Sequence, residues 1–243
     1  MEKPVIGITA DIEFRAGENP GRPFYILDSA LVAAIEGAGG IPLLLPHNRE
    51  NIINYLDLID GLIVSGDSYR FTSPGLFPNL ADDVTDPATP DFKLQRTRFE
   101  LALTKEALAQ DIPLLAICAG FQILNVVVGG EIIVSLNEEP GIAAYHRQSE
   151  PAHVTTHPVH IPENTVFRGI IGSAELQINS IHSQGIRLAD KARAAAIAPD
   201  GLVEAIEIPG QKFCIGTQWH PEFLLENANF NILKALVKAS RTQ

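Results

Sequence analysis

The residues best suited to chemistry follow apolar runs of strand length, and the first of them is a cysteine. Residues 114–117 are apolar and lead directly into Cys118, which is followed by Ala119, Gly120 and a helical pattern. This order is typical of a nucleophile elbow, here with cysteine in place of serine. The start of the helix would stabilise a thiolate, and the Ala119 N–H could donate to an oxyanion. The alternative is a buried structural cysteine at a strand end.

The second group follows the apolar run 213–217 and contains a histidine and a carboxylate. Pro221 disfavours helix at His220, so the segment is extended and the side chains of His220 and Glu222 point to the same side. Glu222 can then hold one imidazole nitrogen and leave the other for a thiol, as the base and orienting acid of a triad do. The alternative is a chance histidine near a helix start, where Glu222 only favours the first turn.

A third strand, residues 61–65, ends in Ser65-Gly66-Asp67. Glycine lets the backbone approach a ligand closely, so the Gly66 turn could supply a second donor to an oxyanion. The alternative is a simple turn.

The elements that must position these residues alternate along the chain. The spacing predicts helices over residues 26–37, 49–58, 92–110, 119–128 and 223–240, and strands over residues 5–9, 41–45, 61–65, 114–117, 154–161, 176–179, 194–198, 203–208 and 213–218. Continuous apolar strands joined by helices indicate an α/β fold with a mostly parallel, doubly wound sheet flanked by helices. The second half adds antiparallel strands. In such a sheet, the site lies at the carboxyl ends of the strands.

Three local patterns give further expectations. Pro42 places the start of the strand 41–45 at an edge of the sheet or at the entry to the strand. The helix 92–110 has Phe99 and Leu103 on one side, and its charged residues lie on the other: Lys93, Arg96, Glu100 and Lys105. Residues 66–91 are rich in Ser, Gly, Asp and Pro and form a loop long enough to indicate a functional role.

The composition excludes several classes of protein. The chain has 243 residues, of which 46% are hydrophobic and 19% charged, and this indicates one folded domain over residues 1–243. The net charge of −11 argues against binding of nucleic acid or of an anionic membrane. Cys118 and Cys214 are too few for a disulfide framework, and their spacing predicts no metal site. Without a long apolar run, a cytoplasmic protein is expected.

These residues together resemble the class I glutamine amidotransferases, which use a Cys-His-Glu triad. The match consists of the elbow at Cys118, Gln122 one turn later, Gly129-Gly130 and His220-Pro221-Glu222, with Cys118 and His220 separated by 102 positions. Within this superfamily the chain looks most like the free-standing γ-glutamyl-γ-aminobutyrate hydrolases of the peptidase C26 type. The supporting segments are Tyr25 and residues 4–9, 39–42, 146–148, 179–184 and 200–207.

The resemblance implies hydrolysis of a γ-glutamyl amide by Cys118, His220 and Glu222 through a thioester, with no cofactor. It implies a small-molecule γ-glutamyl substrate as the partner and is compatible with a homodimer. It also implies roles in oxyanion or substrate binding for a further set of residues: Gly66, Asp67, Ala119, Gln122, His146, Arg147, Gln148, Ser180 and His182.

The chain departs from the family pattern at four positions. Ala116 and Ala119 stand where the family usually has Gly and Arg, Asp67 replaces a Gly, and Ser183 replaces a His. These departures leave the amine half of the substrate open. Two alternative functions also remain: a glutaminase that passes ammonia to a separate synthetase, and a non-catalytic relative on the same scaffold.

Overall fold

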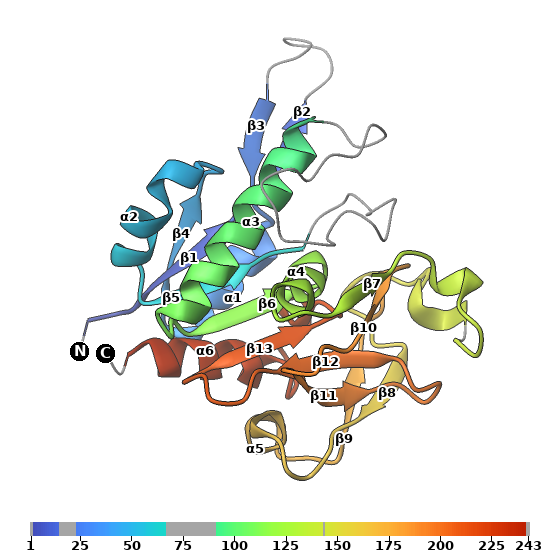
Figure 1. The fold of residues 1–243 in the computed structure, drawn as a ribbon. Helices are drawn as coiled ribbons and strands as arrows, with labels where there is room; N and C mark the ends of the chain where they lie inside the picture. The colour runs from blue at the N-terminus through green and yellow to red at the C-terminus, as the bar shows by residue number, and fades with distance from the viewer. Residues whose placement is uncertain (1, 15–22, 67–90, 143, 242–243) are drawn as a thin grey trace.

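The computed structural model describes residues 2–14, 23–66, 91–142 and 144–241, and its centre is a nine-stranded sheet of order β4-β1-β5-β6-β13-β12-β11-β8-β9 (Figure 1). The first five strands in this order are parallel: β4 (Ile41–Leu45), β1 (Val5–Thr9), β5 (Gly61–Val64), β6 (Leu114–Ile117) and β13 (Cys214–Thr217). The other four are antiparallel: β12 (Val203–Glu207), β11 (Arg193–Ile197), β8 (His157–His160) and β9 (Glu175–Ile178). The predicted fold class is confirmed.

Helices cover both faces of the parallel half, as Figure 1 shows. One face packs against α1 (Ser29–Ala38) and α6 (Phe230–Ser240), and the other against α2 (Ile52–Asp57), α3 (Asp91–Ala109) and α4 (Ala119–Val127). A further helix, α5 (Val166–Ile171), packs beside α6 and β11 in the antiparallel half. In β5, Leu62 and Val64 belong to the second core while Ile63 belongs to the first. A strand buried on both faces is apolar at every position, which explains the continuous runs in the sequence.

Two small sheets were not expected from the sequence. The hairpin β2 (Asp11–Phe14) and β3 (Pro23–Ile26) projects beyond the main sheet, and β7 (Glu131–Ile133) pairs with β10 (Gly185–Arg187). Short 3-10 turns occupy Arg49–Asn51, Leu136–Glu138, Ala144–His146 and Pro221–Phe223. The expectation for Pro42 is confirmed, because β4 is the first strand of the sheet.

The last helix begins at Phe230, so the predicted start at residue 223 is wrong. The cause is Asn229, whose side chain accepts from Trp219 Nε1 at 2.8 Å and donates to the Gln177 carbonyl at 3.0 Å. These contacts hold the preceding residues in turns. They join residues far apart in the chain, so helical spacing could not reveal them.

The charged side of α3 is largely buried, which its helical spacing did not indicate. Arg96, Glu100 and Lys93 are buried, at 0%, 3% and 5% exposure, while Lys105 is exposed. Arg96 pairs with Asp11 on β2 at 2.9 Å and with Glu100 at 3.0 Å, and Lys93 also contacts Asp11. Burial alone would raise the pKa of Asp11, but Arg96 and Lys93 lower it to about 2. The carboxylate therefore stays ionised and anchors β2 to α3.

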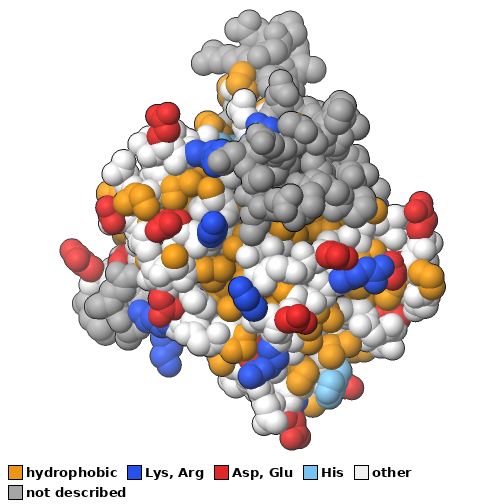
Figure 2. Space-filling view, viewed as in Figure 1, with side chains coloured by type: hydrophobic (Ala, Val, Ile, Leu, Met, Phe, Trp, Pro, Cys, Tyr) orange, Lys and Arg blue, Asp and Glu red, His pale blue; other side chains and the backbone are white. Residues whose placement is uncertain are grey.

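On the face in Figure 2, Lys and Arg side chains lie scattered among Asp and Glu side chains. Among the described helices, none combines the length and the apolar character needed to cross a membrane. The predicted loop 66–91, apart from its two end residues, lies outside the described residues, and so does Asp67.

Candidate active site

Cys118 occupies a strained turn between β6 and α4. Its φ of 52° and ψ of −104° are rare for a residue with a side chain. The Cys118 N–H donates to the Thr217 carbonyl at 2.8 Å, which ties the turn to β13. Gly120 lets α4 approach β5, because a Cβ at this position would lie 2.0 Å from the Val64 carbonyl oxygen. The sulfur is thus presented at the carboxyl ends of the strands, on the wall of a cavity of about 480 Å³.

His220 and Glu222 line the same cavity. His220 Nδ1 lies 2.8 Å from Glu222 Oε1, so the other ring nitrogen is left for a second group. Burial alone would lower the pKa of His220, but the Glu222 carboxylate and the Cys118 sulfur raise it well above its ordinary value. The ring can therefore hold a proton at neutral pH.

The backbone of His220 is held by Asn179, which follows β9. His220 N–H donates to Asn179 Oδ1, and Asn179 Nδ2 donates to the His220 carbonyl, both at 3.0 Å. Asn179 is fully buried and also donates to the Ala152 carbonyl. The sequence segment 179–184 supported the resemblance, yet no role was predicted for this side chain. The sequence signal that could have identified Asn179 is a polar residue at the end of an otherwise apolar strand.

Gly66 lies against both reactive side chains. A Cβ at Gly66 would lie 2.9 Å from His220 Cε1 and 3.4 Å from Cys118 Cβ, so a side chain there would intrude on the pair. Arg96 Nη2 donates to the Gly66 carbonyl at 2.8 Å and to the Ser65 carbonyl at 3.3 Å. The buried charges on α3 therefore fix the turn at the end of β5.

A pair of glutamines extends from the sulfur into the core. Gln218 Nε2 lies 3.7 Å from Cys118 Sγ, and Gln122 Nε2 donates to Gln218 Oε1 at 3.0 Å. Both side chains are buried, and Gln122 also lines the cavity. The sequence predicted Gln122 but gave no role to Gln218, although it lies two residues before His220 in the same motif.

The other predicted binding residues fall into two groups. Arg147 and His182 line the cavity, and Ala119 joins them at the first position of α4. His146 and Ser180 are buried behind this wall. Gln148 is engaged in the loop itself, because it donates to three carbonyls and accepts the Ser180 N–H at 2.6 Å. The structure therefore does not bring Gln148, Ser180 or His146 to the cavity lining.

A mixed sheet with a cysteine elbow at the carboxyl ends of its parallel strands is the architecture of the class I glutamine amidotransferases. A glutamine amidotransferase of Thermotoga maritima has this fold, with a TM-score of 0.60 at 14% identity over 99% of this chain and 97% of its own. The chain belongs to the peptidase C26 family, whose model matches residues 4–222.

Two relatives show the same membership over nearly the full length. The γ-glutamyl-γ-aminobutyrate hydrolase of Escherichia coli O157:H7 is 31% identical over 233 residues, covering 92% of this chain and 87% of its own. A glutamine amidotransferase-like protein of Rickettsia prowazekii is 31% identical over 282 residues, covering 99% of each chain. The protein is a glutamine amidotransferase-like hydrolase.

Proposed function

We propose that this protein hydrolyses the γ-amide bond of a γ-glutamyl amine, with Cys118 as nucleophile, His220 as base and Glu222 as the residue that orients the base. The observation that carries this proposal is the geometry of His220. Its Nδ1 is bound to Glu222 at 2.8 Å, and its raised pKa is partly due to Cys118. A strained cysteine and an oriented imidazole on one cavity are the parts that nucleophilic acyl transfer requires.

In the first half of the reaction, Cys118 Sγ attacks the γ-carbonyl carbon and its proton passes to His220 Nε2. The carbonyl oxygen becomes an oxyanion, stabilised by the N–H of Ala119 and by the turn at Gly66. The C–N bond then breaks, and His220 returns the proton to the leaving amine. The products of this half-reaction are the free amine and a γ-glutamyl thioester.

In the second half, water attacks the thioester carbonyl and gives one proton to His220. The C–S bond breaks, glutamate leaves, and the proton returns to the sulfur. Glu222 stabilises the imidazolium in both halves, because its carboxylate contacts the ring directly. The residues described suffice for these proton transfers.

Arg147 is the residue we assign to the α-carboxylate of the substrate. Among the described residues that line the cavity, it alone carries a permanent positive charge. Its guanidinium suits bidentate pairing with a carboxylate. γ-Glutamyl-γ-aminobutyrate is the first substrate to test, because the Escherichia coli relative is named for it.

The test is a glutamate-release assay with γ-glutamyl-γ-aminobutyrate, γ-glutamyl polyamines and glutamine, with Cys118→Ala as control. We expect turnover of a γ-glutamyl amine that the control lacks. Acid quenching should reveal a glutamyl group on Cys118 by intact-mass spectrometry. A clear preference for glutamine would favour the ammonia-supplying glutaminase. No turnover and no glutamyl adduct with any of these compounds would contradict the proposal and favour a non-catalytic relative.

A further inference from the structure

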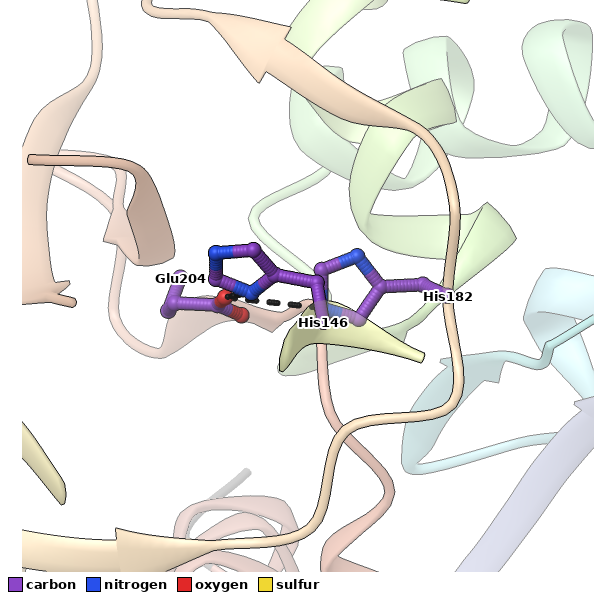
Figure 3. A group of neighbouring side chains, drawn as sticks. All are labelled: His146, His182 and Glu204. Carbon is purple, nitrogen blue, oxygen red and sulfur yellow. Dashed lines mark ion pairs between the residues drawn. The ribbon is translucent and has the colours of Figure 1, made fainter. Parts of the chain in front are cut away.

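At the cavity wall, which includes His182, three segments far apart in the chain bring two histidines and a glutamate together (Figure 3). His146 ends a 3-10 turn, His182 lies in the loop after β9, and Glu204 is on β12. All three are buried, at 2%, 5% and 0% exposure. One ligand atom of each lies within 4.8 Å of the others. No single stretch of sequence contains this group, so spacing could not predict it.

The ring of His146 has an acceptor at each nitrogen. Nε2 lies 2.9 Å from Asp200 Oδ2, in hydrogen-bond geometry. Nδ1 lies 2.9 Å from Glu204 Oε1, but the two atoms do not meet hydrogen-bond geometry, and within the described part of the chain neither atom has a hydrogen-bond partner. If Nε2 donates to Asp200, a neutral ring directs the lone pair of Nδ1 at the carboxylate.

The ring of His182 is arranged in the same way. Nδ1 lies 2.9 Å from the Gln184 carbonyl, to which it must donate. Nε2 lies 3.4 Å from Glu204 Oε1 and 3.2 Å from Ser180 Oγ. The Ser180 hydroxyl donates its single proton to the His146 carbonyl at 2.8 Å, so it has none left for the ring. The lone pair of a neutral His182 therefore also points at Glu204.

Two arrangements could satisfy these groups. In the first, both rings are imidazolium ions, buried with their centroids 5.2 Å apart. In the second, both rings are neutral and a cation lies between their inner nitrogens and Glu204. The second avoids two like charges in the interior, and one divalent ion balances the carboxylates of Glu204 and Asp200.

We propose that His146 Nδ1, His182 Nε2 and Glu204 bind a divalent transition-metal ion, with Zn²⁺ as the best match. Two imidazoles and one carboxylate form a known ligand set for Zn²⁺. Asp200 and the Gln184 carbonyl take the outer N–H groups of the two rings. Such outer partners are the usual feature of histidines that bind zinc, because they fix the ring and its tautomer.

The ion would act as a structural link behind the cavity. It would join the turn that precedes Arg147, the loop that carries His182 along the cavity, and β12. The Glu204 carbonyl accepts the N–H of Gln218 at 2.7 Å, and Gln218 contacts the Cys118 sulfur. The ion would therefore hold the wall and the base of the cavity in one arrangement, without itself touching the reacting atoms.

The experiment measures zinc in tag-free protein that carries Cys118→Ser, which removes the thiol of the cavity as a competing ligand. After stripping with a chelator and reconstitution with Zn²⁺, mass spectrometry of the metal should give about one ion per chain. Glu204→Gln should lose the ion. Asp200→Asn should weaken zinc affinity about 10–100-fold, because it removes only an outer partner. Asp190→Asn, an exposed aspartate, is the matched control and should bind normally.

A second measurement leaves all three proposed ligands unchanged. Stripped wild-type-like protein (Cys118→Ser alone) is titrated with Co²⁺, and we expect the visible ligand-field absorption of a low-coordinate site, saturating at one equivalent. Absence of zinc uptake and of this absorption would overturn the proposal. A nitrogen NMR spectrum of the zinc-reconstituted protein in which the rings of His146 and His182 are both protonated at both nitrogens would also overturn it. Zinc that persists in folded Glu204→Gln would also overturn it.

Discussion

The two halves of the sheet each place a histidine beside a buried glutamate, and the pairs differ in what the other ring nitrogen meets. In the parallel half, His220 lies 2.8 Å from Glu222, and its second nitrogen is left for the cysteine on a strained turn. In the antiparallel half, His146 lies 2.9 Å from Glu204, and its second nitrogen meets Asp200. The distances are nearly equal, yet only the first pair retains a group that can exchange a proton with substrate.

The two pairs also differ in the exposure of the histidine to the cavity. The His220 side chain is 14% exposed and faces the cavity, while the His146 side chain is 3% exposed and lies behind its wall. A histidine and a carboxylate in contact therefore do not define a catalytic base. A catalytic base also needs a second ring nitrogen that is left for the reacting groups and that faces the cavity. The following predictions test this distinction.

The largest expected effect is in the parallel half. Cys118→Ala should abolish γ-glutamyl amide hydrolysis, since no other described thiol reaches the cavity. The variant should keep its far-ultraviolet circular dichroism, because the substitution removes a single sulfur. Turnover of the variant at the wild-type rate would contradict the assignment of catalysis to this half.

The second prediction concerns stability in the antiparallel half. Glu204→Gln should lower the free energy of unfolding by about 3–5 kcal/mol, because it leaves buried imidazole groups without their carboxylate. Urea denaturation followed by tryptophan fluorescence measures this loss. Glu175→Gln, at the exposed start of β9, is the control and should stay within about 0.5 kcal/mol of wild type.

The matching substitution in the other pair should affect rate more than stability. Glu222→Gln should lower kcat about 10–10³-fold, because an amide cannot stabilise the imidazolium that forms during proton transfer. Steady-state kinetics on the active γ-glutamyl amide gives the value. A variant with unchanged kcat would show that Glu222 does not orient the base.

A smaller difference is expected between the two cysteines. Burial raises the pKa of the Cys214 thiol, which lies within β13, whereas Cys118 lines the cavity. Brief iodoacetamide treatment near neutral pH should therefore label Cys118 at least about tenfold faster than Cys214. Peptide mass spectrometry distinguishes the sites. Faster labelling of Cys214 would contradict the assignment of Cys118 as the activated thiol.

The smallest effect is a pH dependence of stability. The pKa of His220 is raised in the folded protein, so its pairing with Glu222 stabilises the fold fully below the unfolded value of about 6.5. This contribution is lost as the pH rises through the folded pKa. The stability gap between wild type and Glu222→Gln should therefore shrink from pH 6 upward. A gap that widens with pH would mean that His220 is not the protonated partner.

The parallel half could be predicted largely from the sequence, because its strands are buried on both faces and its chemistry sits at strand ends. The continuous run before Cys118 and the proline after His220 both carry local signals. The segment from His220 to Glu222 is not extended as predicted, because Pro221–Phe223 form a 3-10 turn, but this turn still brings Glu222 Oε1 within 2.8 Å of His220 Nδ1. Arg96 shows the limit of such signals. Helical spacing placed it on the polar side of α3, but it pairs with Asp11 and with the Gly66 turn after β5, each at least 30 positions away.

The elements around the antiparallel half were harder to predict than its four strands, for a related reason. The short elements β7, β10 and α5 have too few residues to show a period. The buried group of His146, His182 and Glu204 comes from three separate segments, each of which looks ordinary alone. Contacts of this kind depend on tertiary packing, which spacing along one chain does not encode.

The contact between Asn179 and His220 has a consequence for how the protein fails on heating. Asn179 follows β9, the outermost strand of the sheet, where local opening costs less than unfolding of the centre. If that edge frays, the backbone of His220 loses both of its hydrogen bonds while the parallel core stays folded. Thermal inactivation should then precede the melting of the parallel core, and on cooling the lost turnover should return as the edge closes.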